Sequence, residues 1–278
     1  MVLSFAVDDL IRRALAEDIP YLDVTADYLI PEDAVNAARW VAKAEGVLCG
    51  IDVGMRVFGL LDSEFIADIL LPEGSKVKPG DVILQMRGHT RALLKGERTA
   101  LNLAQHLSGV ATATRRAADI VAGTNASITD TRKTLPGLRA LQKYAVTVGG
   151  GKNHRMNLSD GAMLKDNHID AAGGITSAVK QLRERLGHMV RLEVETRNLA
   201  EVAEALAVGA DIIMLDNMSP DQMRDAVKLV NGKALLEASG NVTVANLREV
   251  AETGVDIISM GALTHSVTAL DISMKIDK

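Results

Sequence analysis

Residues 130–168 read DTRKTLPGLRALQKYAVTVGGGKNHRMNLSDGAMLKDNH and contain seven Lys or Arg and two His against three acids. The whole chain has a formal net charge of −5, so this positive density is local. Alternation at the start of the stretch predicts a strand end with Asp130 and Arg132 on one face and Thr131 and Lys133 on the other. Both faces of this strand end therefore carry a cation.

A helix is predicted directly after this strand, because Pro136 is followed by apolar residues at helical spacing. The residues of its apolar stripe are Leu138, Leu141, Ala145 and Val148. The glycines 149–151 end the helix and allow backbone amides to approach a bound anion. His154 and Arg155 follow, and Lys165 ends the next apolar run. Fixed cations around a glycine-rich loop suit a small polyanionic ligand.

Strands and helices alternate after Gly123. Strand ends are predicted at Arg132, Lys165, Glu193, Asp216, Glu237 and Ser259, with helical patterns at 200–209, 220–230 and 243–254. The intervals between successive ends, by subtraction, run from 21 to 33 residues, which indicates βα units and a parallel sheet. Because no G-x-G-x-x-G opens a helix after the first strand, an α/β barrel is favoured over a dinucleotide-binding fold. Barrels place their chemistry at the strand ends.

A smaller domain is expected before the barrel, since 278 residues exceed a typical single domain. Short strand-like runs fill residues 35–90, with a turn at 79–81. A long helical pattern at 93–123 then links the first domain to the second and carries Arg98 near its start.

Composition excludes several classes of protein. The net charge of −5 and a pI near 5.7 argue against a nucleic-acid binder. The amphipathic N-terminus, with acids at positions 8 and 9, is neither a signal peptide nor a membrane span. The single Cys49 cannot form an internal disulfide and has no activating motif, which favours a reducing, cytoplasmic setting over a catalytic thiol.

Several motifs in order resemble the quinolinate phosphoribosyltransferase family, the decarboxylating enzymes of de novo NAD synthesis. They include DTRKTLPG, GGGKNHR, KDNH, EDIPYLDVT, PEDA, LKGERTALNLAQHLSGVAT, IIMLDNMSP, LLEASGNVT and ETGVDIISMGALTHS. The resemblance implies an α/β fold with an incomplete TIM-like barrel of roughly six or seven strands at 109–267. It also implies a smaller α+β sandwich domain at 1–108, to which 268–278 return.

The resemblance also implies the ligands. Guanidinium forks suit planar carboxylates. The two carboxylates of quinolinate are assigned to Arg132, His154, Arg155 and Lys165, helped by the partner subunit's Arg98 in a homodimer with a shared active site. Thr131, Lys133 and Lys165 meet phosphoribosyl pyrophosphate, and Glu193 and Asp216 lie on its ribose and Mg²⁺ side. The 5′-phosphate is assigned to Ser239, Gly240, Asn241, Met260, Gly261 and Ala262. Catalytic roles fall to Lys133, Lys165, Glu193 and Asp216.

The implied reaction is attack of the pyridine nitrogen on the anomeric carbon as pyrophosphate leaves. Glu193 and Asp216 would stabilise positive charge in the transition state and help hold Mg²⁺. The quaternised ring then loses its 2-carboxylate as CO2, which gives nicotinate mononucleotide. Glu195, on the same face of its strand as Glu193, is expected to play a supporting part.

Four positions depart from the family pattern: Leu22, Leu135, Asn157 and Ser159. The last three leave room for a changed substrate. Two other functions stay open. Lys165 could be the Schiff-base lysine of a barrel lyase or aldolase. A non-enzymatic anion-binding paralogue associated with molybdenum transport is disfavoured, because KDNH is present at 165–168.

Overall fold

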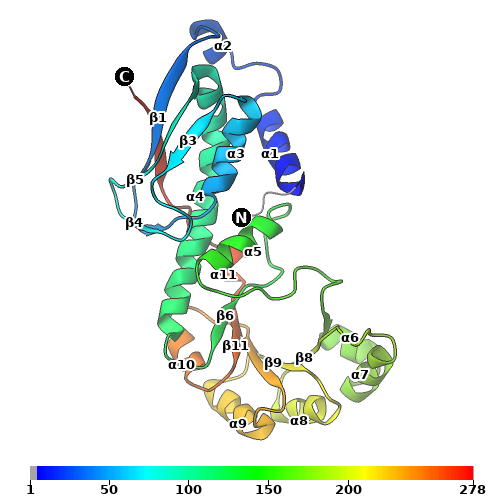
Figure 1. Cartoon of the computed structure of the whole chain (residues 1–278). Helices are drawn as coiled ribbons and strands as arrows, with labels where there is room; N and C mark the ends of the chain where they lie inside the picture. Colours follow the sequence, from blue (N-terminus) through cyan, green and yellow to red (C-terminus); the bar gives the residue numbers. More distant parts are fainter. Residues whose placement is uncertain (1–4, 278) are drawn as a thin grey trace. The chain divides into compact units, whose positions relative to one another are not determined.

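The computed structural model describes residues 5–277, which form two compact units (Figure 1). The first unit comprises the residues up to Arg115, Pro136–Gly149 and the residues from Ser266. The second comprises Arg116–Leu135 and Gly150–His265. Helix α4, Thr90–Val121, runs from the first unit into the second without a break. The chain passes between the units three more times, at the start and the end of Pro136–Gly149 and before Ser266.

The first unit is built on a four-stranded antiparallel sheet in the order β12-β1-β5-β3. Its strands are β1 (Val35–Ala42), β3 (Ile66–Ile69), β5 (Val82–His89) and β12 (Ile272–Ile276). Strands β2 (Gly46–Val47) and β4 (Lys76–Val77) pair separately. The other helices of this unit are α1 (Phe5–Asp18), α2 (Ala26–Leu29), α3 (Ile51–Leu61) and α5 (Arg139–Val148). The last strand of the chain thus completes the first sheet by pairing with β1.

Helix α3 was not predicted, because the patterns of residues 35–90 indicated only short strands. Apolar residues alternate at Ile51, Val53 and Val57, which is typical of a strand. In the structure, Val57 and Phe58 pack at helical spacing from Val53, and all are fully buried. Phe58 meets Trp40 of β1 edge to face, with ring centroids 6.3 Å apart. The packing of Phe58 against Trp40 therefore favours a helix at residues 51–61.

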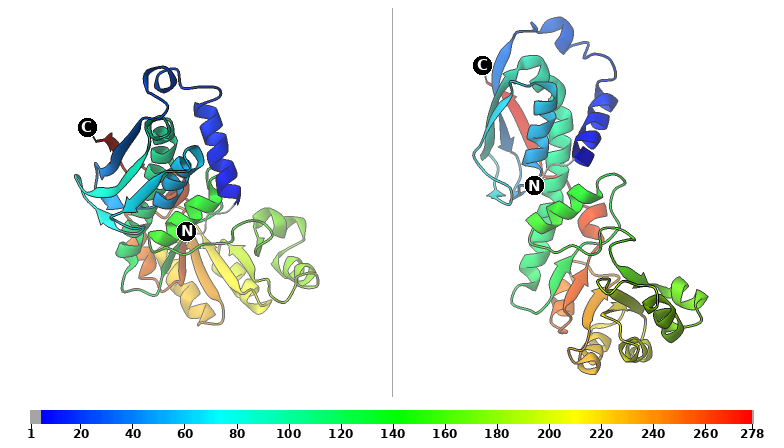
Figure 2. Two further views of the ribbon diagram at one scale, coloured as in Figure 1. Left: turned by 45° about the horizontal axis from the view of Figure 1, so that its top comes forward. Right: turned by 45° about the vertical axis from the view of Figure 1, so that its right-hand side comes forward.

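The second unit contains a six-stranded sheet in which every pairing is parallel, in the order β6-β11-β10-β9-β8-β7. Its strands are β6 (Ser127–Thr129), β7 (Ala162–Leu164), β8 (Leu192–Thr196), β9 (Ile212–Asp216), β10 (Leu235–Ser239) and β11 (Ile257–Ser259). Its helices are α6 (Asp166–Ala171), α7 (Ile175–Arg183), α8 (Leu199–Ala207), α9 (Pro220–Val230), α10 (Leu247–Ala251) and α11 (Ala262–His265). Because β6 and β7 are its two edges, the sheet is an incomplete α/β barrel, as predicted (Figure 2).

The strand ends agree with the predictions in part. Strands β7, β9 and β11 end within one residue of the predicted Lys165, Asp216 and Ser259. Glu193 and Glu237 were wrongly taken as ends, since each lies inside its strand among buried neighbours. A charged residue in a parallel strand can face the interior of a barrel, and its charge then does not mark an end.

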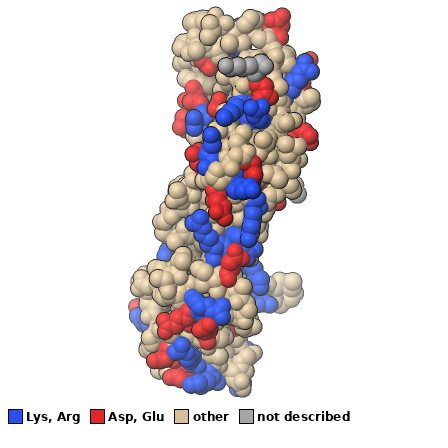
Figure 3. Space-filling model, turned by 90° about the vertical axis from the view of Figure 1, so that its left-hand side faces the viewer, with Lys and Arg blue, Asp and Glu red and all other residues tan. Residues whose placement is uncertain are grey.

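The surface carries mixed charge on the face drawn in Figure 3, where Lys and Arg alternate with Asp and Glu. Among residues 5–277, the helices include none that is both long and apolar enough to span a membrane. Cys49 is a buried free thiol, and burial raises its pKa far above that of an exposed cysteine. This thiol is therefore part of the core.

Candidate active site

A cavity of about 580 Å³ lies in the second unit, at the carboxyl ends of the strands. The predicted site residues that line it are Thr131, Arg132, Lys133, His154, Arg155, Lys165, Asp216, Ser239, Gly240 and Asn241. Glu195, expected to play a supporting part, also lines it, together with five residues not assigned to the site from sequence: Met163, Met214, Asn217, Glu237 and Ser259. The strand-end residues thus converge, as parallel strands require.

Five predicted site residues do not line this cavity: Arg98, Glu193, Met260, Gly261 and Ala262. Arg98 is an exposed residue of α4 in the first unit. Gly261 contributes through Lys133, since a Cβ at Gly261 would lie 2.9 Å from the Lys133 Cδ. The Thr264 hydroxyl donates to the Lys133 carbonyl oxygen at 2.7 Å. The loop before α11 and the helix itself therefore position Lys133.

Arg155 is held at both ends. Its backbone N–H donates to Nδ1 of His154 at 2.7 Å, and its Nη1 donates to the carbonyl oxygen of Gly161 at 2.8 Å. Burial and the neighbouring Arg132 guanidinium lower the pKa of Arg155, and Glu193 partly opposes this. Because a guanidinium has so high a pKa, Arg155 stays cationic at neutral pH. The guanidinium groups of Arg132 and Arg155 are thus two neighbouring positive charges, and together they form a site for an anion.

Lys165 enters the cavity from the end of β7. Its Nζ donates to Oε2 of Glu195 at 3.1 Å, and its backbone N–H donates to Nδ1 of His168 at 3.0 Å. The Lys165 side chain is 50% exposed, whereas that of Glu195 is 12% exposed. Glu195 therefore fixes the ammonium group at the rim of the cavity.

Glu193, which the resemblance assigns to the ribose and Mg²⁺ side, is placed differently from Glu195. Alternation put Glu193 and Glu195 on one face of β8, and the structure agrees. Two residues of a strand span roughly 7 Å, so Glu193 lies deeper in the barrel than Glu195. Glu195 lines the cavity together with Asp216, and Glu193 does not. The alternation of residues predicts on which face of a strand a side chain lies. It does not predict how deep in the barrel that side chain lies.

Glu193 belongs instead to a buried cluster with His154 and Glu237. Nε2 of His154 lies 3.0 Å from Oε2 of Glu193 and 3.6 Å from Oε2 of Glu237. The two glutamates are 3% and 1% exposed, and their Oε1 atoms have no hydrogen-bond partner among the described residues. His154 and Glu237 also line a second cavity of about 360 Å³, with Glu193. The cluster thus fills the barrel between the two cavities.

The three side chains are of the types that bind metals, and their donor atoms lie within 4.8 Å of one another. The Arg155 N–H donates to Nδ1 of His154, so Nδ1 is an acceptor and the ring proton is on Nε2. Nε2 then donates to Glu193 and has no lone pair for a metal. The cluster is therefore a hydrogen-bonded support for His154.

Glu237 should make stability depend on pH. Burial and then the adjacent Glu193 carboxylate raise the pKa of Glu237 from 4.5 to about 7. Between these values the folded protein binds a proton that the unfolded chain has lost. The stabilising contribution is therefore fully present below pH 4.5 and is lost as pH rises through about 7. With roughly 1.4 kcal/mol per pKa unit, the loss is at most about 3 kcal/mol.

Glu237→Gln tests this prediction, because glutamine copies the neutral acid and does not titrate. Urea unfolding of the wild type should show stability falling relative to the variant between about pH 5 and about pH 8. Glu249→Gln, at an exposed position, is the control and should follow the wild type. Parallel pH profiles for the wild type and Glu237→Gln would contradict the raised pKa.

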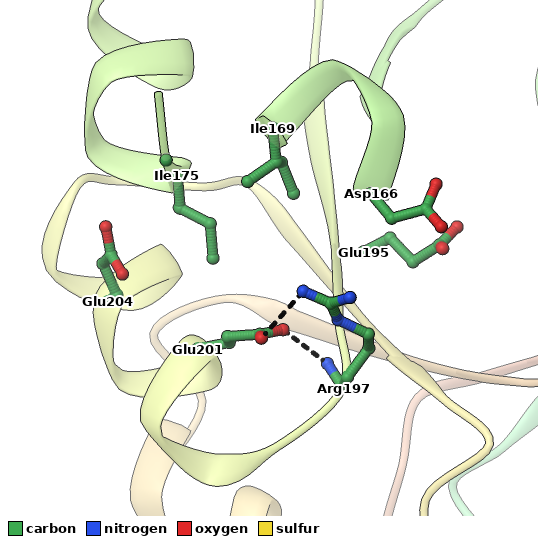
Figure 4. A pocket seen from close by; sticks show the side chains of 8 residues that line it. Asp166, Ile169, Ile175, Glu195, Arg197, Glu201 and Glu204 are labelled. Carbon is green, nitrogen blue, oxygen red and sulfur yellow. Dashed lines mark hydrogen bonds and ion pairs between the residues drawn. The ribbon is translucent and has the colours of Figure 1, made fainter. Parts of the chain in front are cut away.

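A third, smaller cavity of about 180 Å³ adjoins the site at Glu195 (Figure 4). Its charged lining residues are Asp166, Glu195, Arg197, Glu201 and Glu204. Arg197 points into it and donates to Glu201 at 3.3 Å, which leaves an excess of acid. This acidic cavity does not suit a phosphate or a carboxylate, so the anion site is the larger cavity.

The departures from the family pattern lie outside the lining of the larger cavity. Asn157 and Ser159 form one turn, because the Asn157 side-chain oxygen accepts from the Ser159 N–H at 2.8 Å. The Met156 N–H donates to Asp160 at 2.8 Å in the same turn. Leu135 is 39% exposed, at the end of a segment of the second unit. These positions therefore change loops around the site and leave its cations in place.

Comparisons with known proteins identify the family to which this chain belongs. Residues 23–108 match the model of the quinolinate phosphoribosyl transferase N-terminal domain, and residues 110–275 match that of the C-terminal domain. A probable nicotinate-nucleotide pyrophosphorylase [carboxylating] from Synechocystis is 48% identical over 273 residues, which cover 97% of this chain and 92% of that protein. The protein of the same name from Bacillus subtilis is 45% identical over 267 residues, covering 96% and 92%.

Solved structures are equally similar. NadC from Streptococcus pyogenes has a TM-score of 0.96 at 41% identity and covers 99% of this chain and 98% of its own. The nicotinate-nucleotide pyrophosphorylase from Francisella tularensis has a TM-score of 0.95 at 40% identity, covering 100% and 98%. With both domain models matched, the chain belongs to the quinolinate phosphoribosyltransferase family.

Proposed function

We propose that this protein transfers the phosphoribosyl group of phosphoribosyl pyrophosphate to quinolinate. The products are nicotinate mononucleotide, pyrophosphate and CO2, in the de novo synthesis of NAD. The observation that carries the proposal is the convergence of Arg132, Arg155 and Lys165 on one cavity that also contains Asp216. The curated relatives named above are nicotinate-nucleotide pyrophosphorylases.

The cations suit a dicarboxylate. Two guanidinium groups, from Arg132 and Arg155, can each form a forked pair with a planar carboxylate. Lys165 adds a point charge that Glu195 holds at the rim. A monocarboxylate such as nicotinate would leave part of this charge unmatched, so quinolinate is the substrate that the cavity fits better.

The opposite side of the cavity suits the sugar. Carboxylates favour the positive charge that develops at an anomeric carbon as pyrophosphate departs. We assign this role to Asp216 and Glu195, with Glu193 orienting His154 from below. Asp216 and Glu195 also form a donor set of the hard oxygen type that Mg²⁺ prefers. Mg²⁺ bound there with pyrophosphate would neutralise charge on the leaving group.

The phosphates are assigned to Lys133 and to the loop of Ser239, Gly240 and Asn241. This loop follows β10 at the carboxyl edge of the sheet, where barrels commonly bind phosphate. Once the ring nitrogen is quaternised, the electron pair left at C2 by the departing CO2 lies beside a cationic nitrogen, and a proton from solvent then bonds to C2. Arg155 and Arg132 hold the ring in place through this step.

The Schiff-base alternative is less favoured. An imine-forming lysine needs a nitrogen that is available to a carbonyl carbon, and the Lys165 Nζ is paired with Glu195 at 3.1 Å. Borohydride trapping with a carbonyl substrate should therefore leave the protein unmodified.

Release of pyrophosphate tests the function. The purified protein is incubated with phosphoribosyl pyrophosphate and Mg²⁺, with quinolinate, with nicotinate and with neither acid. Pyrophosphate and CO2 should appear in equal amounts with quinolinate only. Equal rates with nicotinate would contradict the dicarboxylate assignment, and release without either acid would indicate a hydrolase.

We further propose that the reaction occurs in a reducing, cytoplasmic compartment, to which the buried free thiol of Cys49 is suited.

We also propose a homodimer in which the active site is completed by the partner subunit's Arg98. Arg98 is exposed on α4 in the first unit. Nearby apolar side chains are exposed too: Tyr21 (95%), Val24 (65%), Tyr28 (79%) and Leu29 (72%). Asp27 of this segment pairs with Lys95 at 2.5 Å, one helical turn from Arg98. Several large apolar side chains exposed in one segment of the chain are a feature of interfaces.

Mixing two inactive variants tests the shared site. Arg98→Ala and Lys165→Ala should each be inactive alone, because each removes a cation from every site. After subunit exchange, half of the dimers are mixed and each mixed dimer has one intact site, so activity should recover to roughly a quarter of wild type. The assay is pyrophosphate release before and after exchange. No recovery, despite exchange seen by mass spectrometry, would place Arg98 in its own chain's site.

A further inference from the structure

Asn217, directly after Asp216 at the end of β9, has a backbone conformation that few residues adopt. Its φ is +54°, in the left-handed region. Its N–H donates to the carbonyl oxygen of Ser239 at 2.9 Å, which continues the pairing of β9 with β10 beyond the strand. The side chain of Asn217 lines the larger cavity. The backbone thus turns this side chain toward the site.

The Asn217 amide makes two hydrogen bonds at once. Its Nδ2 donates to Oδ2 of Asp216 at 2.8 Å. Its Oδ1 accepts from Nδ2 of Asn241 at 2.9 Å. A side-chain amide supplies a donor and an acceptor from one planar group, whereas an ionised aspartate only accepts and leucine does neither, so these residues could not make both bonds. The amide therefore connects the end of β9 with the loop after β10.

The loop is fitted closely to this amide. Gly240 has a φ of +82°, and a Cβ there would lie 2.3 Å from Oδ1 of Asn217. Asn241 also has a positive φ, of +50°, and its carbonyl oxygen accepts from Nδ2 of Asn246 at 3.1 Å. Residues 239–241 therefore take their shape around the Asn217 side chain.

We propose that Asn217 is a positioning residue that fixes the Asp216 carboxylate and the loop 239–241 in one arrangement for phosphoribosyl pyrophosphate. The proposal rests on the proposed function, which assigns Asp216 to the sugar side and the loop to the 5′-phosphate. Both groups act on one substrate molecule, so their separation has to match its length. A side chain hydrogen-bonded to both sets that separation.

The simpler interpretation is that Asn217 is a turn residue chosen for its positive φ. Glycine adopts positive φ at least as readily, so Asn217→Gly keeps the turn and removes only the amide. Asn217→Asp keeps the size, loses the donor and brings a second carboxylate against Asp216. Asn231→Gly is the matched control, since Asn231 also has a positive φ, of +46°, and lies at the end of α9 outside the cavity lining.

Binding is measured by calorimetry on the whole protein with Mg²⁺. Phthalate, a dicarboxylate without the attacking nitrogen, occupies the acid site so that no reaction occurs. Hydrogen bonds to charged groups are strong enough that both Asn217 variants should bind phosphoribosyl pyrophosphate about tenfold more weakly or worse. Phthalate affinity and the thermal midpoint of the free protein should stay at wild-type values. The control should bind both ligands as the wild type does.

A double-mutant cycle with Asn241→Ala separates coupling from a local effect. If Asn217 acts through Asn241, Asn241→Ala should weaken the binding of phosphoribosyl pyrophosphate less in Asn217→Gly than in the wild type. Wild-type affinity in Asn217→Gly, or multiplied losses in the double variant, would overturn the proposal. A wild type that does not bind phosphoribosyl pyrophosphate would refute the proposed function instead, so the two failures are distinct.

Discussion

Arg155→Ala is expected to lower kcat/KM for quinolinate by about 10²- to 10³-fold. Removing one partner of a buried charge pair costs about 3–5 kcal/mol, and about 1.4 kcal/mol corresponds to a factor of ten. Arg155 is tied to Gly161 and to the His154 ring, so no neighbouring side chain can swing into its place without breaking these bonds. The loss should appear in initial rates at varied quinolinate and saturating phosphoribosyl pyrophosphate.

Arg155→Lys refines this test, because it keeps the charge and loses the fork. Its kcat/KM should lie between those of the wild type and Arg155→Ala. Arg185→Ala, at an exposed position after α7, is the control and should leave the kinetics unchanged. If Arg155→Ala retained kcat/KM within about threefold of wild type, the carboxylates would have to be held by other cations.

Asp216→Asn should lower kcat by about 10²- to 10³-fold and change KM little. A group that stabilises charge only in the transition state affects turnover, and its loss costs about 3–4 kcal/mol in comparable sites. Asparagine has nearly the size of aspartate and still offers an oxygen to Nδ2 of Asn217, so the arrangement at the end of β9 is kept.

The measurement is the separation of kcat from KM for both substrates. Asp225→Asn is the control, because Asp225 pairs with Lys228 on an exposed face of α9. A raised KM with unchanged kcat would make Asp216 an anchor for the substrate. Glu195→Gln should also lower kcat, as Asp216→Asn does. Glu193→Gln should instead disturb the orientation of His154 and so weaken quinolinate binding.

The sequence predicted the parallel sheet and most of the cavity lining because both are local properties of the strand ends. Lys165 and Asp216 directly follow or end an apolar strand run, and the carboxyl ends of parallel strands meet at one edge. Helix α9 has the predicted bounds, since Ser219 caps it and Pro220 opens it.

Depth and side-chain pairing could not be predicted in the same way. Glu193 and Glu195 have the same alternation, and only the structure separates the one beneath His154 from the one at the rim. Asn217 looks in sequence like a turn residue, and its bond to Asn241 joins positions 24 apart. Glu237 was predicted as a strand end, because its burial beside Glu193 arises only when the strands assemble into the curved sheet.

Strand β12 belongs to the first unit, although it follows the whole barrel unit along the chain. The ribosome makes residues 272–276 after every strand of the barrel unit, yet these residues form the edge of the sheet that begins with β1. Domains usually fold in the order in which they are made. Here one edge of β1 stays unpaired in the nascent first unit, because Trp40 and its neighbours pair with a strand that is made after the barrel unit. The later-made barrel unit is therefore the first that can be complete during translation.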